Sequence, residues 1–343
     1  MEDSVRLLPG LLLPWFRENA RPLPWRENQE PYSVWLSEIM LQQTRVEAVK
    51  GYYTRFLQAL PDVFALAEVP EEQLLKLWEG LGYYNRARNL QKTARIVAWE
   101  REGRFPDTAE ELLALPGIGE YTAGAIASIC FDRPCAAVDG NVLRVLSRYL
   151  ADAAPREEQK KRFRLLLEAV YPPGQCGLFT QSLMELGASV CVPNGAPRCE
   201  VCPLREHCEA CLRGEVQAFP KKEAKKPRRQ QALTVFLLDC DGKLALCKRP
   251  SRGLLAGLWQ LPNAEGEMTV EQALAQVERW GLRPSDVRAQ LRRKHIFTHV
   301  EWNMTGYEIT VQEQTGPFVW HTRQELAREY ALPTAFRQFL EEA

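Results

Sequence analysis

The apolar positions follow two different periods along the chain. Between Ser33 and about Cys191 they recur at intervals of three and four, the spacing that places side chains on one face of an α-helix. The clearest runs are 34–41, 74–81, 123–129 and 163–170. This part of the sequence therefore predicts an all-α domain.

Beyond about residue 232 the period changes to two, which is typical of strands with one buried face. Residues 233–238 and 243–249 alternate in this way and flank the turn dipeptide Asp241-Gly242, so they predict a β-hairpin. The sequence then predicts a helix, further strands and a last helix, over 270–280, within 294–310 and over 322–340. The second part is expected to form a small α+β domain.

A basic segment separates the two patterns. Residues 217–231 include six Lys or Arg and two Pro and offer little that can enter a core, a composition typical of linkers. A chain of 343 residues also exceeds the usual size of one domain. We therefore expect a helical domain over 1–213, a basic linker over 214–231 and a second domain over 232–343.

The overall charge favours no class of protein, because 44 basic residues balance 44 acidic ones. Any contact with nucleic acid must come from local clusters of positive charge. The apolar run 7–13 follows two acidic residues and contains a proline and a glycine, so we expect no signal peptide. No apolar stretch approaches the roughly 20 residues that span a bilayer. We expect an intracellular protein, in the cytoplasm or nucleoid if the source is bacterial.

Residues 111–128 predict two helices joined by a tight turn, Pro116-Gly117-Ile118-Gly119. Glycines allow the backbone to take positive φ and to approach a partner closely. The amides of Gly117, Ile118 and Gly119 and the start of the second helix can then hold a phosphate, while Ile118 packs inside. This pattern favours a helix-hairpin-helix motif, which contacts the DNA backbone rather than the bases. An ordinary connection between two helices is the alternative.

A Pro- and Gly-bearing loop after the last predicted helix of the first domain carries four cysteines: Cys191, Cys199, Cys202 and Cys208. In a chain of this length without export signals, clustered thiols favour a metal site over disulfides. Zinc and iron-sulfur clusters both accept four thiolates, so both stay open. His207 and Cys211 lie close by, either as spare ligands or as solvated loop residues.

Two carboxylates suit chemistry at a glycosidic bond, which breaks through an oxocarbenium-like state and needs an acid for the leaving group and an anion near the sugar. Glu38 lies among apolar residues of a predicted helix, where burial would raise its pKa and keep a proton available. Asp139 precedes Gly140 at the start of another helix. The alternatives are a solvated helix face for Glu38 and a helix N-cap for Asp139.

Six segments of the first domain resemble the MutY-type adenine DNA glycosylases of the endonuclease III superfamily, and they cover residues 14–210 almost continuously. They are LPWR at 23–26, WLSEIMLQQT at 35–44, GLGYYNRARNL at 80–90, LPGIGEYTAG at 115–124, AVDGNV at 137–142 and MELGASVC at 184–191. The resemblance implies a monomeric base-excision enzyme that removes adenine mispaired with 8-oxoguanine or guanine in double-stranded DNA. It also implies a 4Fe-4S cluster rather than zinc, although this loop has seven residues between its first two cysteines where the family has six.

The same resemblance implies roles for individual residues. Glu38 would protonate the adenine and later act on the water, Asp139 would stabilise the oxocarbenium or a covalent sugar intermediate, and Asn141 would position the active-site groups. Tyr121 occupies the place where bifunctional relatives carry a lysine, and no lysine occurs between positions 93 and 159. Because a lyase needs an amine nucleophile, we predict a monofunctional glycosylase that leaves an abasic site.

Extruding a base from the duplex requires residues that enter the stack and a pocket for the base. By the resemblance, two groups serve these purposes: Gln42, Gln43 and Tyr83 on the side of the oxidised guanine, and Trp25, Arg26 and Glu185 around the adenine. Core packing is the alternative for Tyr83 and Trp25.

Residues 233–340 resemble the MutT-like (Nudix-like) C-terminal domain of the same family, notably in RGLLAGLWQLP at 252–262 and KHIFTHVEW at 294–302. The helix that follows the first of these segments lacks the clustered acidic residues with which a Nudix hydrolase binds magnesium. Nucleotide hydrolysis is therefore not expected.

In the family a Phe-Ser-His turn contacts 8-oxoguanine, and Phe297-Thr298-His299 matches it with a threonine that keeps the hydroxyl. An exposed strand end is the alternative for this turn. Two other functions compete: a pyrimidine glycosylase-lyase like endonuclease III, and a non-catalytic, cluster-bearing DNA-binding or redox-sensing protein. The missing lysine and the second domain count against the former, and the carboxylates Glu38 and Asp139 against the latter.

Overall fold

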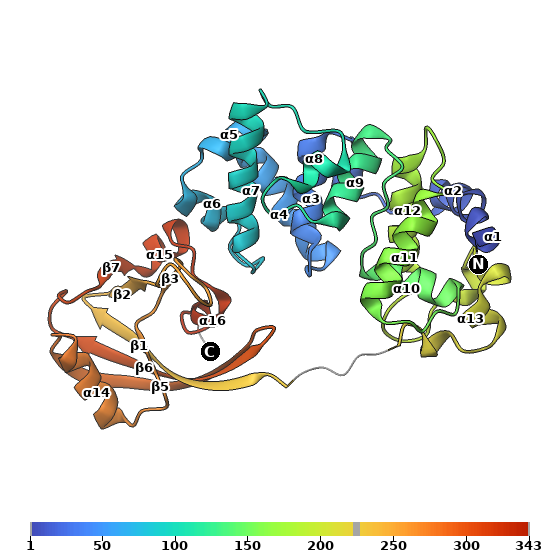
Figure 1. Ribbon diagram of the computed structural model, residues 1–343. Coiled ribbons are helices and arrows are strands. Elements are labelled where there is room, and N and C mark those ends of the chain that lie inside the picture. Colours follow the sequence, from blue (N-terminus) through green and yellow to red (C-terminus); the bar gives the residue numbers. More distant parts are fainter. Residues whose placement is uncertain (1, 222–226, 342–343) are drawn as a thin grey trace. The chain divides into compact units, whose positions relative to one another are not determined.

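The computed structural model describes residues 2–221 and 227–341 of the chain. Their contacts group into two compact units, the first formed by Met1–Glu68 and Arg88–Ala224 and the second by Val69–Ala87 and Lys225–Ala343. The first unit is helical and the second contains a β-sheet (Figure 1). An all-α part followed by an α+β part is the fold class that the sequence predicts. Of the basic linker expected over 214–231, residues 222–226 lie outside the described part.

The first unit is built from α-helices and single 3-10 or π turns (η). In chain order they are α1 (Glu2–Arg6), α2 (Leu8–Asn19), η1 (Pro24–Arg26), α3 (Pro31–Leu41), α4 (Val46–Ala59), α5 (Val63–Glu68), α7 (Asn85–Arg95), η2 (Ile96–Glu100), α8 (Ala109–Leu113), α9 (Glu120–Phe131), α10 (Gly140–Tyr149), α11 (Arg156–Glu168), α12 (Cys176–Ser189), η3 (Cys199–Val201), η4 (Arg205–His207), α13 (Glu209–Leu212) and η5 (Val216–Ala218). Residues of α7 before Arg88 belong to the second unit. No described helix is long and apolar enough to cross a membrane.

Helix α12 is central to the packing of the first unit, because it contacts α2, α9 and α10 (Figure 1). Two of its glycines make the close approach to its neighbours feasible. A Cβ atom at Gly177 would lie 2.9 Å from Ile129 Cα in α9, and one at Gly187 would lie 2.6 Å from Asn141 Cβ in α10. Any larger side chain at these positions would push the helices apart. The first turn of α12 is thus held close to the end of α9, and its last turn is held close to the start of α10.

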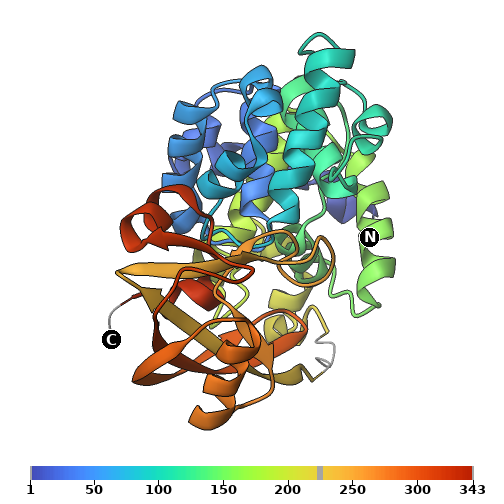
Figure 2. The same cartoon turned by 90° about the vertical axis from the view of Figure 1, so that its left-hand side faces the viewer.

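The second unit combines one helix from the first half of the chain with the C-terminal sheet. Its elements are α6 (Glu71–Leu77), β1 (Arg229–Cys240), β2 (Lys243–Lys248), β3 (Trp259–Gln260), β4 (Asn263–Glu265), α14 (Val270–Arg279), β5 (Pro284–Ile296), β6 (Val300–Val311), β7 (Val319–Thr322), α15 (Arg323–Glu329) and α16 (Thr334–Arg337). The strand order is β3-β2-β1-β6-β5, with β4 paired to β1 and β7 to β2. Figure 1 labels the strands, and Figure 2 shows the same sheet turned by 90°. Strand β1 runs parallel to β6 and antiparallel to β2.

Alternation along β1 gives the sheet an apolar core on each face. Leu233, Val235 and Leu237 pack with residues of α15 and α16, whereas Phe236 and Leu238 pack with α14. Helices therefore cover both faces of the sheet and form three layers with it, because each apolar face must be buried against another element. The predicted hairpin is present, and Asp241 and Gly242 at its tip have φ of 52° and 75°, as a type I′ turn needs.

Three of the predicted element boundaries are wrong. The last helix, expected over 322–340, is broken into α15 and α16, because Pro333 disfavours helical backbone in the residue before it. Strand β5 begins at Pro284, well before residue 294. Its side chains alternate between exposed and half-buried at a sheet edge, so it lacks an apolar signal. The helix expected over 74–81 ends at Leu77, and Gly80 and Gly82 follow with positive φ.

Candidate active site

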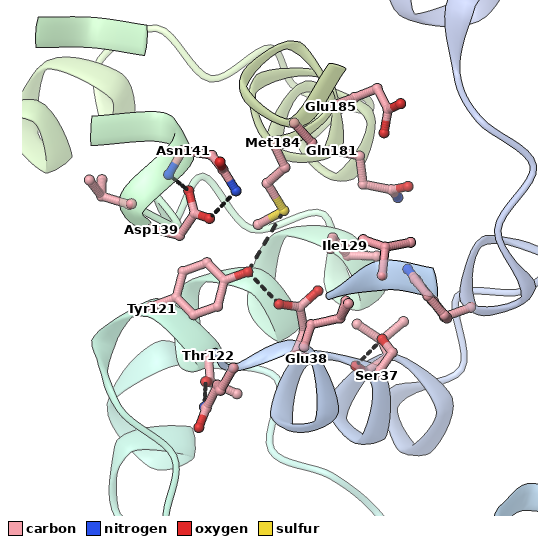
Figure 3. Close-up of a pocket in the computed structure, with 18 of the residues that line it drawn as sticks. Ser37, Glu38, Tyr121, Thr122, Ile129, Asp139, Asn141, Gln181, Met184 and Glu185 are labelled. Carbon is pink, nitrogen blue, oxygen red and sulfur yellow. Dashed lines mark hydrogen bonds between the residues drawn. The ribbon is translucent and has the colours of Figure 1, made fainter. Parts of the chain in front are cut away.

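A cavity of about 710 Å³ opens in the first unit among η1, α3, α9, α10 and α12. Most of the residues that the sequence nominates for catalysis or base binding gather in its lining: Trp25, Arg26, Glu38, Gln42, Gln43, Tyr121, Asp139, Asn141 and Glu185. They come from five elements that are distant in sequence. Figure 3 labels Glu38, Tyr121, Asp139, Asn141 and Glu185 around this cavity. The other nominated residues, described below, lie elsewhere.

Glu38 lies on the buried face of α3 with 5% of its surface exposed. The hydroxyl of Tyr121, at the start of α9, donates a hydrogen bond of 2.5 Å to its carboxylate (Figure 3). Burial raises the pKa of Glu38 to about 7, the bond from Tyr121 lowers it and the negative charge of Asp139 raises it. Glu38 thus holds a proton at neutral pH in a large fraction of molecules, and it does not lie on a solvated helix face.

Asp139 is the N-cap of α10 and also faces the cavity. Its carboxylate accepts hydrogen bonds from the N–H groups of Val142 and Asn141, at 2.7 and 2.8 Å, and from the Asn141 side-chain amide at 2.8 Å. Burial raises the pKa of Asp139, and these donors act against the rise. Capping and a place in the site coexist, because the cap fixes the carboxylate rigidly toward the cavity.

Asn141 is itself fixed by a buried arginine. Arg144 Nη2 donates to Asn141 Oδ1 at 2.9 Å and to the carbonyl of Gly187 in α12 at 2.7 Å. Its Nε donates to the carbonyl of Cys191 at 2.8 Å. Asn141 can therefore present only its amide N–H side to Asp139. Arg144 connects the catalytic cavity to the start of the cysteine loop.

Glu185 of α12 is buried and paired with two arginines. Arg21 donates two hydrogen bonds to it, at 2.5 and 3.1 Å, and Arg26 donates one of 2.7 Å. Burial alone would raise the pKa of Glu185, but the two guanidinium groups together hold it below its ordinary value. Within one cavity the pKa of Glu38 is thus raised and that of Glu185 is lowered.

Trp25 is buried and packs edge-on against Tyr53, so it serves the core and lines the cavity at once. Gln42 and Gln43 follow the end of α3. The Gln42 side-chain amide donates to Thr122 Oγ1 at 3.4 Å, and Gln43 is exposed with φ of 58°. Both lie where the cavity meets solvent.

The lining residues that were not foreseen include Arg21, Lys160, Gln181 and Met184. Met184 Sδ lies 3.9 Å from the Tyr121 hydroxyl. Residues three or four positions apart share a helix face, so the spacing of Gln181, Met184 and Glu185 was a usable signal. Nothing in the sequence connects Arg21 or Lys160 to the site.

The glycine turn lies between α8 and α9. Ile118 is buried, whereas Gly117 and Gly119 are exposed. Gly117 has φ of 78°, and a Cβ there would lie 2.6 Å from Asn89 Cβ; Gly119 is the N-cap of α9 and has open space around it. The exposed turn and its buried isoleucine have the arrangement expected of a helix-hairpin-helix motif.

Comparisons with known proteins agree with this geometry. The family model "HhH-GPD superfamily base excision DNA repair protein" matches residues 36–173, and a NUDIX domain model matches 234–342. The adenine DNA glycosylase of Homo sapiens is 36% identical over 91% of this chain and 68% of its own length. That of Mus musculus is 34% identical over 96% and 77%. The chain belongs to the adenine DNA glycosylase family.

The family extends to bacteria, since the adenine DNA glycosylase of Buchnera aphidicola subsp. Acyrthosiphon pisum is 33% identical over 84% of this chain and 82% of its own length. Among solved structures, a thermostable thymine-DNA glycosylase aligns with a TM-score of 0.56 at 29% identity, covering 62% of this chain and 98% of its own. An endonuclease III–DNA complex aligns with a TM-score of 0.53 at 23% identity over the same shares and shows the helical fold alone. The predicted resemblance and fold class are confirmed.

A second, small cavity of about 20 Å³ lies beside the end of α12 in this member of the adenine DNA glycosylase family. The four nominated cysteines surround it: Cys191, Cys199, Cys202 and Cys208. Arg148 Nη1 lies 3.2 Å from Cys191 Sγ. The backbone N–H of Leu204 hydrogen-bonds the Cys202 thiol, and that of Cys211 the Cys208 thiol. Cys211 lines the same cavity, whereas His207 is exposed outside it.

The Phe297-Thr298-His299 turn connects β5 and β6 in the second unit. Phe297 packs between the rings of His295 and Trp302, while Thr298 and His299 are exposed. Tyr83, which belongs to the same unit, shares a hydrogen bond of 2.7 Å with Thr298 Oγ1 and is 50% exposed. Tyr83 is therefore not a core residue. Tyr83 and Thr298, both nominated for the side of the oxidised guanine, thus contact each other.

Proposed function

We propose that the protein is a monofunctional adenine DNA glycosylase that acts on double-stranded DNA in which adenine is paired with 8-oxoguanine or guanine. The observation that carries this proposal is the pair of carboxyl groups in one cavity, with Glu38 buried under Tyr121 and Asp139 capping α10. The names of the relatives supply the substrate class. The chemistry follows from the residues.

Glu38 is assigned as the general acid that protonates the leaving adenine. An acid works best when its pKa lies near the working pH, and the pKa of Glu38 is about 7. After it gives up its proton, the Glu38 carboxylate can take one from the water that attacks the sugar. Tyr121 assists by donating to Glu38, which favours the ionised form left after proton transfer.

Asp139 is assigned to the sugar. When the bond from C1′ to the base breaks, positive charge develops on the deoxyribose, and a fixed anion nearby lowers the energy of that state. The two N–H groups and the Asn141 amide hold the Asp139 carboxylate in place before the reaction begins. Asn141, locked by Arg144, acts as a positioning residue.

Glu185 is assigned to base selection together with Trp25 and Arg26. An ionised carboxylate only accepts hydrogen bonds, so Glu185 suits the exocyclic amino group of adenine. A keto oxygen at the same place would meet a second acceptor, and a buried mismatch of this kind is costly. Trp25 provides an apolar wall for the base.

The monofunctional assignment follows from the amines in reach of the sugar. Lys160 supplies the lysine amine among the described residues that line the cavity. Its Nζ is held 2.7 Å from Glu157 Oε1 in an ion pair. A Schiff base needs an amine that can attack the sugar, and Tyr121 stands where the bifunctional relatives have lysine. Base release is thus assigned to a water nucleophile.

Binding of the duplex is assigned to three features. Gly117, Ile118 and Gly119 would hold the DNA backbone. Gln42, Gln43 and Tyr83 would enter the stack. The Phe297-Thr298-His299 turn would distinguish 8-oxoguanine from guanine, with the Thr298 hydroxyl and His299 exposed for the purpose.

A 4Fe-4S cluster is assigned to Cys191, Cys199, Cys202 and Cys208. The donor set fits, because four thiols surround one cavity, N–H groups point at two of the sulfurs and Arg148 offsets negative charge. The preference for a cluster over zinc comes from the family resemblance. The metal–thiolate bonds of the cluster would fix the loop, and no step of adenine release is assigned to it.

The test is a single-turnover assay of adenine release from a duplex with one 8-oxoguanine opposite adenine. Wild type should release adenine, whereas Glu38→Gln and Asp139→Asn should not, and the exposed Glu47→Gln should match wild type. Strand cleavage at the abasic site by the purified enzyme would overturn the monofunctional assignment. An absorption spectrum without the broad visible bands of an iron-sulfur cluster would overturn the cluster.

A further inference from the structure

The cavity of the cysteine loop has one thiol more than a four-ligand cluster uses. Five cysteines line it: Cys191, Cys199, Cys202, Cys208 and Cys211. They do not share the same surroundings. Cys191, Cys202 and Cys208 pack against the core formed by α2, α10, α11 and α12, and Cys199 and Cys211 do not belong to that core.

The two outer cysteines are in direct contact. The thiols of Cys199 and Cys211 hydrogen-bond each other. Cys199 begins η3, a single turn that ends at the exposed Val201, and Cys211 lies in the single-turn helix α13. Cluster sulfurs must lie well apart, one on each iron, so two touching thiols cannot both be ligands at the same time. The Cys199 and Cys211 thiols would therefore compete for one ligand position of the cluster.

We propose that Cys211 is a replacement ligand for Cys199, so that either thiol can hold the outer iron of the cluster while the three core-packed cysteines hold the rest. The exchange is a ligand substitution without a redox step. The Cys211 thiol gives its proton to water and its sulfur bonds the iron, and the Cys199 sulfur leaves the iron and takes up a proton. This inference rests on the cluster assigned above.

The short helix α13 suits this purpose. Its backbone N–H at Cys211 hydrogen-bonds the Cys208 thiol and its N–H at Ala210 does the same, so the turn that carries Cys211 is tied to a ligand that does not change. Ala210 is fully buried and anchors the turn. With the cluster bound, the exchange would then require a change of rotamer at Cys211 while α13 stays tied to Cys208.

The test compares full-length holo-proteins with alanine substitutions, since serine oxygen can itself bind iron. Iron content and the visible absorption band are measured for Cys211→Ala, Cys199→Ala, the double variant and Cys202→Ala, which has no spare thiol beside it. Cys199→Ala should keep the iron and the band, as should Cys211→Ala. The double variant and Cys202→Ala should lose both.

A second measurement identifies the ligand directly. Native protein is alkylated with iodoacetamide and its peptides are weighed. In Cys199→Ala, Cys211 should become protected, and release of the iron by a chelator should restore its labelling. Loss of iron in Cys199→Ala to the level of Cys202→Ala would overturn the inference, as would retained iron with a reactive Cys211. Wild type without iron would instead refute the cluster itself.

Discussion

The Tyr121 hydroxyl donates a 2.5 Å hydrogen bond to Glu38, a carboxyl group that burial keeps partly protonated at neutral pH. The bond favours the ionised carboxylate, while burial favours the neutral acid. The balance between the two sets the pH at which Glu38 gives up its proton. Three of the predictions below concern the carboxyl groups of this cavity.

The rate of adenine release should fall as the pH rises through about 7, because the acid form of Glu38 is then lost. Tyr121→Phe removes a bond that lowers the pKa of Glu38, so the fall should move to higher pH. Glu38→Gln should lose roughly 10²- to 10⁴-fold in rate and show no such limb. Single-turnover rates across the pH range test this; a limb unmoved in Tyr121→Phe would contradict it.

The burial of Glu38 should also make the free energy of unfolding depend on pH. The pKa of Glu38 is raised in the fold from 4.5 to about 7, so its contribution to stability is fully present below the unfolded value and is lost as the pH rises through about 7. The loss amounts to about 3 kcal/mol. Glu38→Gln should therefore be more stable than wild type at high pH.

Urea unfolding at about pH 5 and about pH 8 measures this loss. The gain from Glu38→Gln should be much larger at the higher pH. The exposed Glu47→Gln is the control and should show no such difference. Equal effects at the two pH values would show that Glu38 does not carry a buried charge.

Two substitutions of Asp139 should distinguish its role as the N-cap of α10 from its role as an anion near the sugar. Asn is as good an N-cap as Asp, so Asp139→Asn should fold with nearly wild-type stability yet lose roughly 10²- to 10³-fold or more in base release, because the anion is gone. Asp139→Ala should in addition lose about 1 kcal/mol of stability. Thermal unfolding beside the adenine-release assay distinguishes them. An active Asp139→Asn would remove Asp139 from the mechanism.

The glycine turn offers a matched pair. Gly117→Ala would combine a positive φ with a clash at Asn89 and should cost about 1–3 kcal/mol. Gly119→Ala meets nothing within 4 Å at negative φ and should leave stability unchanged. Both should weaken DNA binding if the backbone approaches a phosphate here. Unfolding curves and binding titrations at one fixed salt concentration check both statements.

Of the catalytic and base-binding residues in the cavity, only the two carboxylates follow from local pattern, and the others that the sequence names are implied by the family resemblance. Glu38 and Asp139 lie in segments where a charged residue interrupts an apolar helix or precedes a glycine, and the turn at Gly117 needs positive φ. Arg21 could not be found in this way, because its partner Glu185 is 164 positions away. Such contacts depend on how α12 packs on its neighbours, and no local period encodes that.

The second unit shows the same limit. The alternating pattern predicts one buried face for β1, but both faces are buried, and 233–238 is an almost continuous apolar run that marks the strand. Strand β5 has no fully buried side chain, and its first half was not foreseen. The grouping of 69–87 with the C-terminal sheet depends on contacts such as Lys76 Nζ to the Tyr330 carbonyl at 3.0 Å. Neither the sequence of 69–87 nor that of the C-terminal segment, taken alone, predicts this contact.

The hydrogen bond between Tyr83 and Thr298 leads to the last prediction. If Thr298 and His299 contact 8-oxoguanine, changing Phe297, Thr298 and His299 together to Ala should reduce the preference for 8-oxoguanine over guanine opposite adenine. Adenine release from the guanine pair should change little, because the catalytic cavity lies in the other unit. Rates on the two duplexes, measured side by side, give the preference as a ratio.

Two controls sharpen this test. Ile296→Ala alters an exposed neighbour on the same strand end and should leave the ratio unchanged. Thr298→Ser keeps the hydroxyl and should also keep the ratio, whereas Thr298→Val should lower it. Tyr83→Phe removes the partner of that hydroxyl and frees it for the base, so it should not reduce the ratio as Thr298→Val does. A triple alanine variant with an unchanged ratio would mean that this turn is only a strand end.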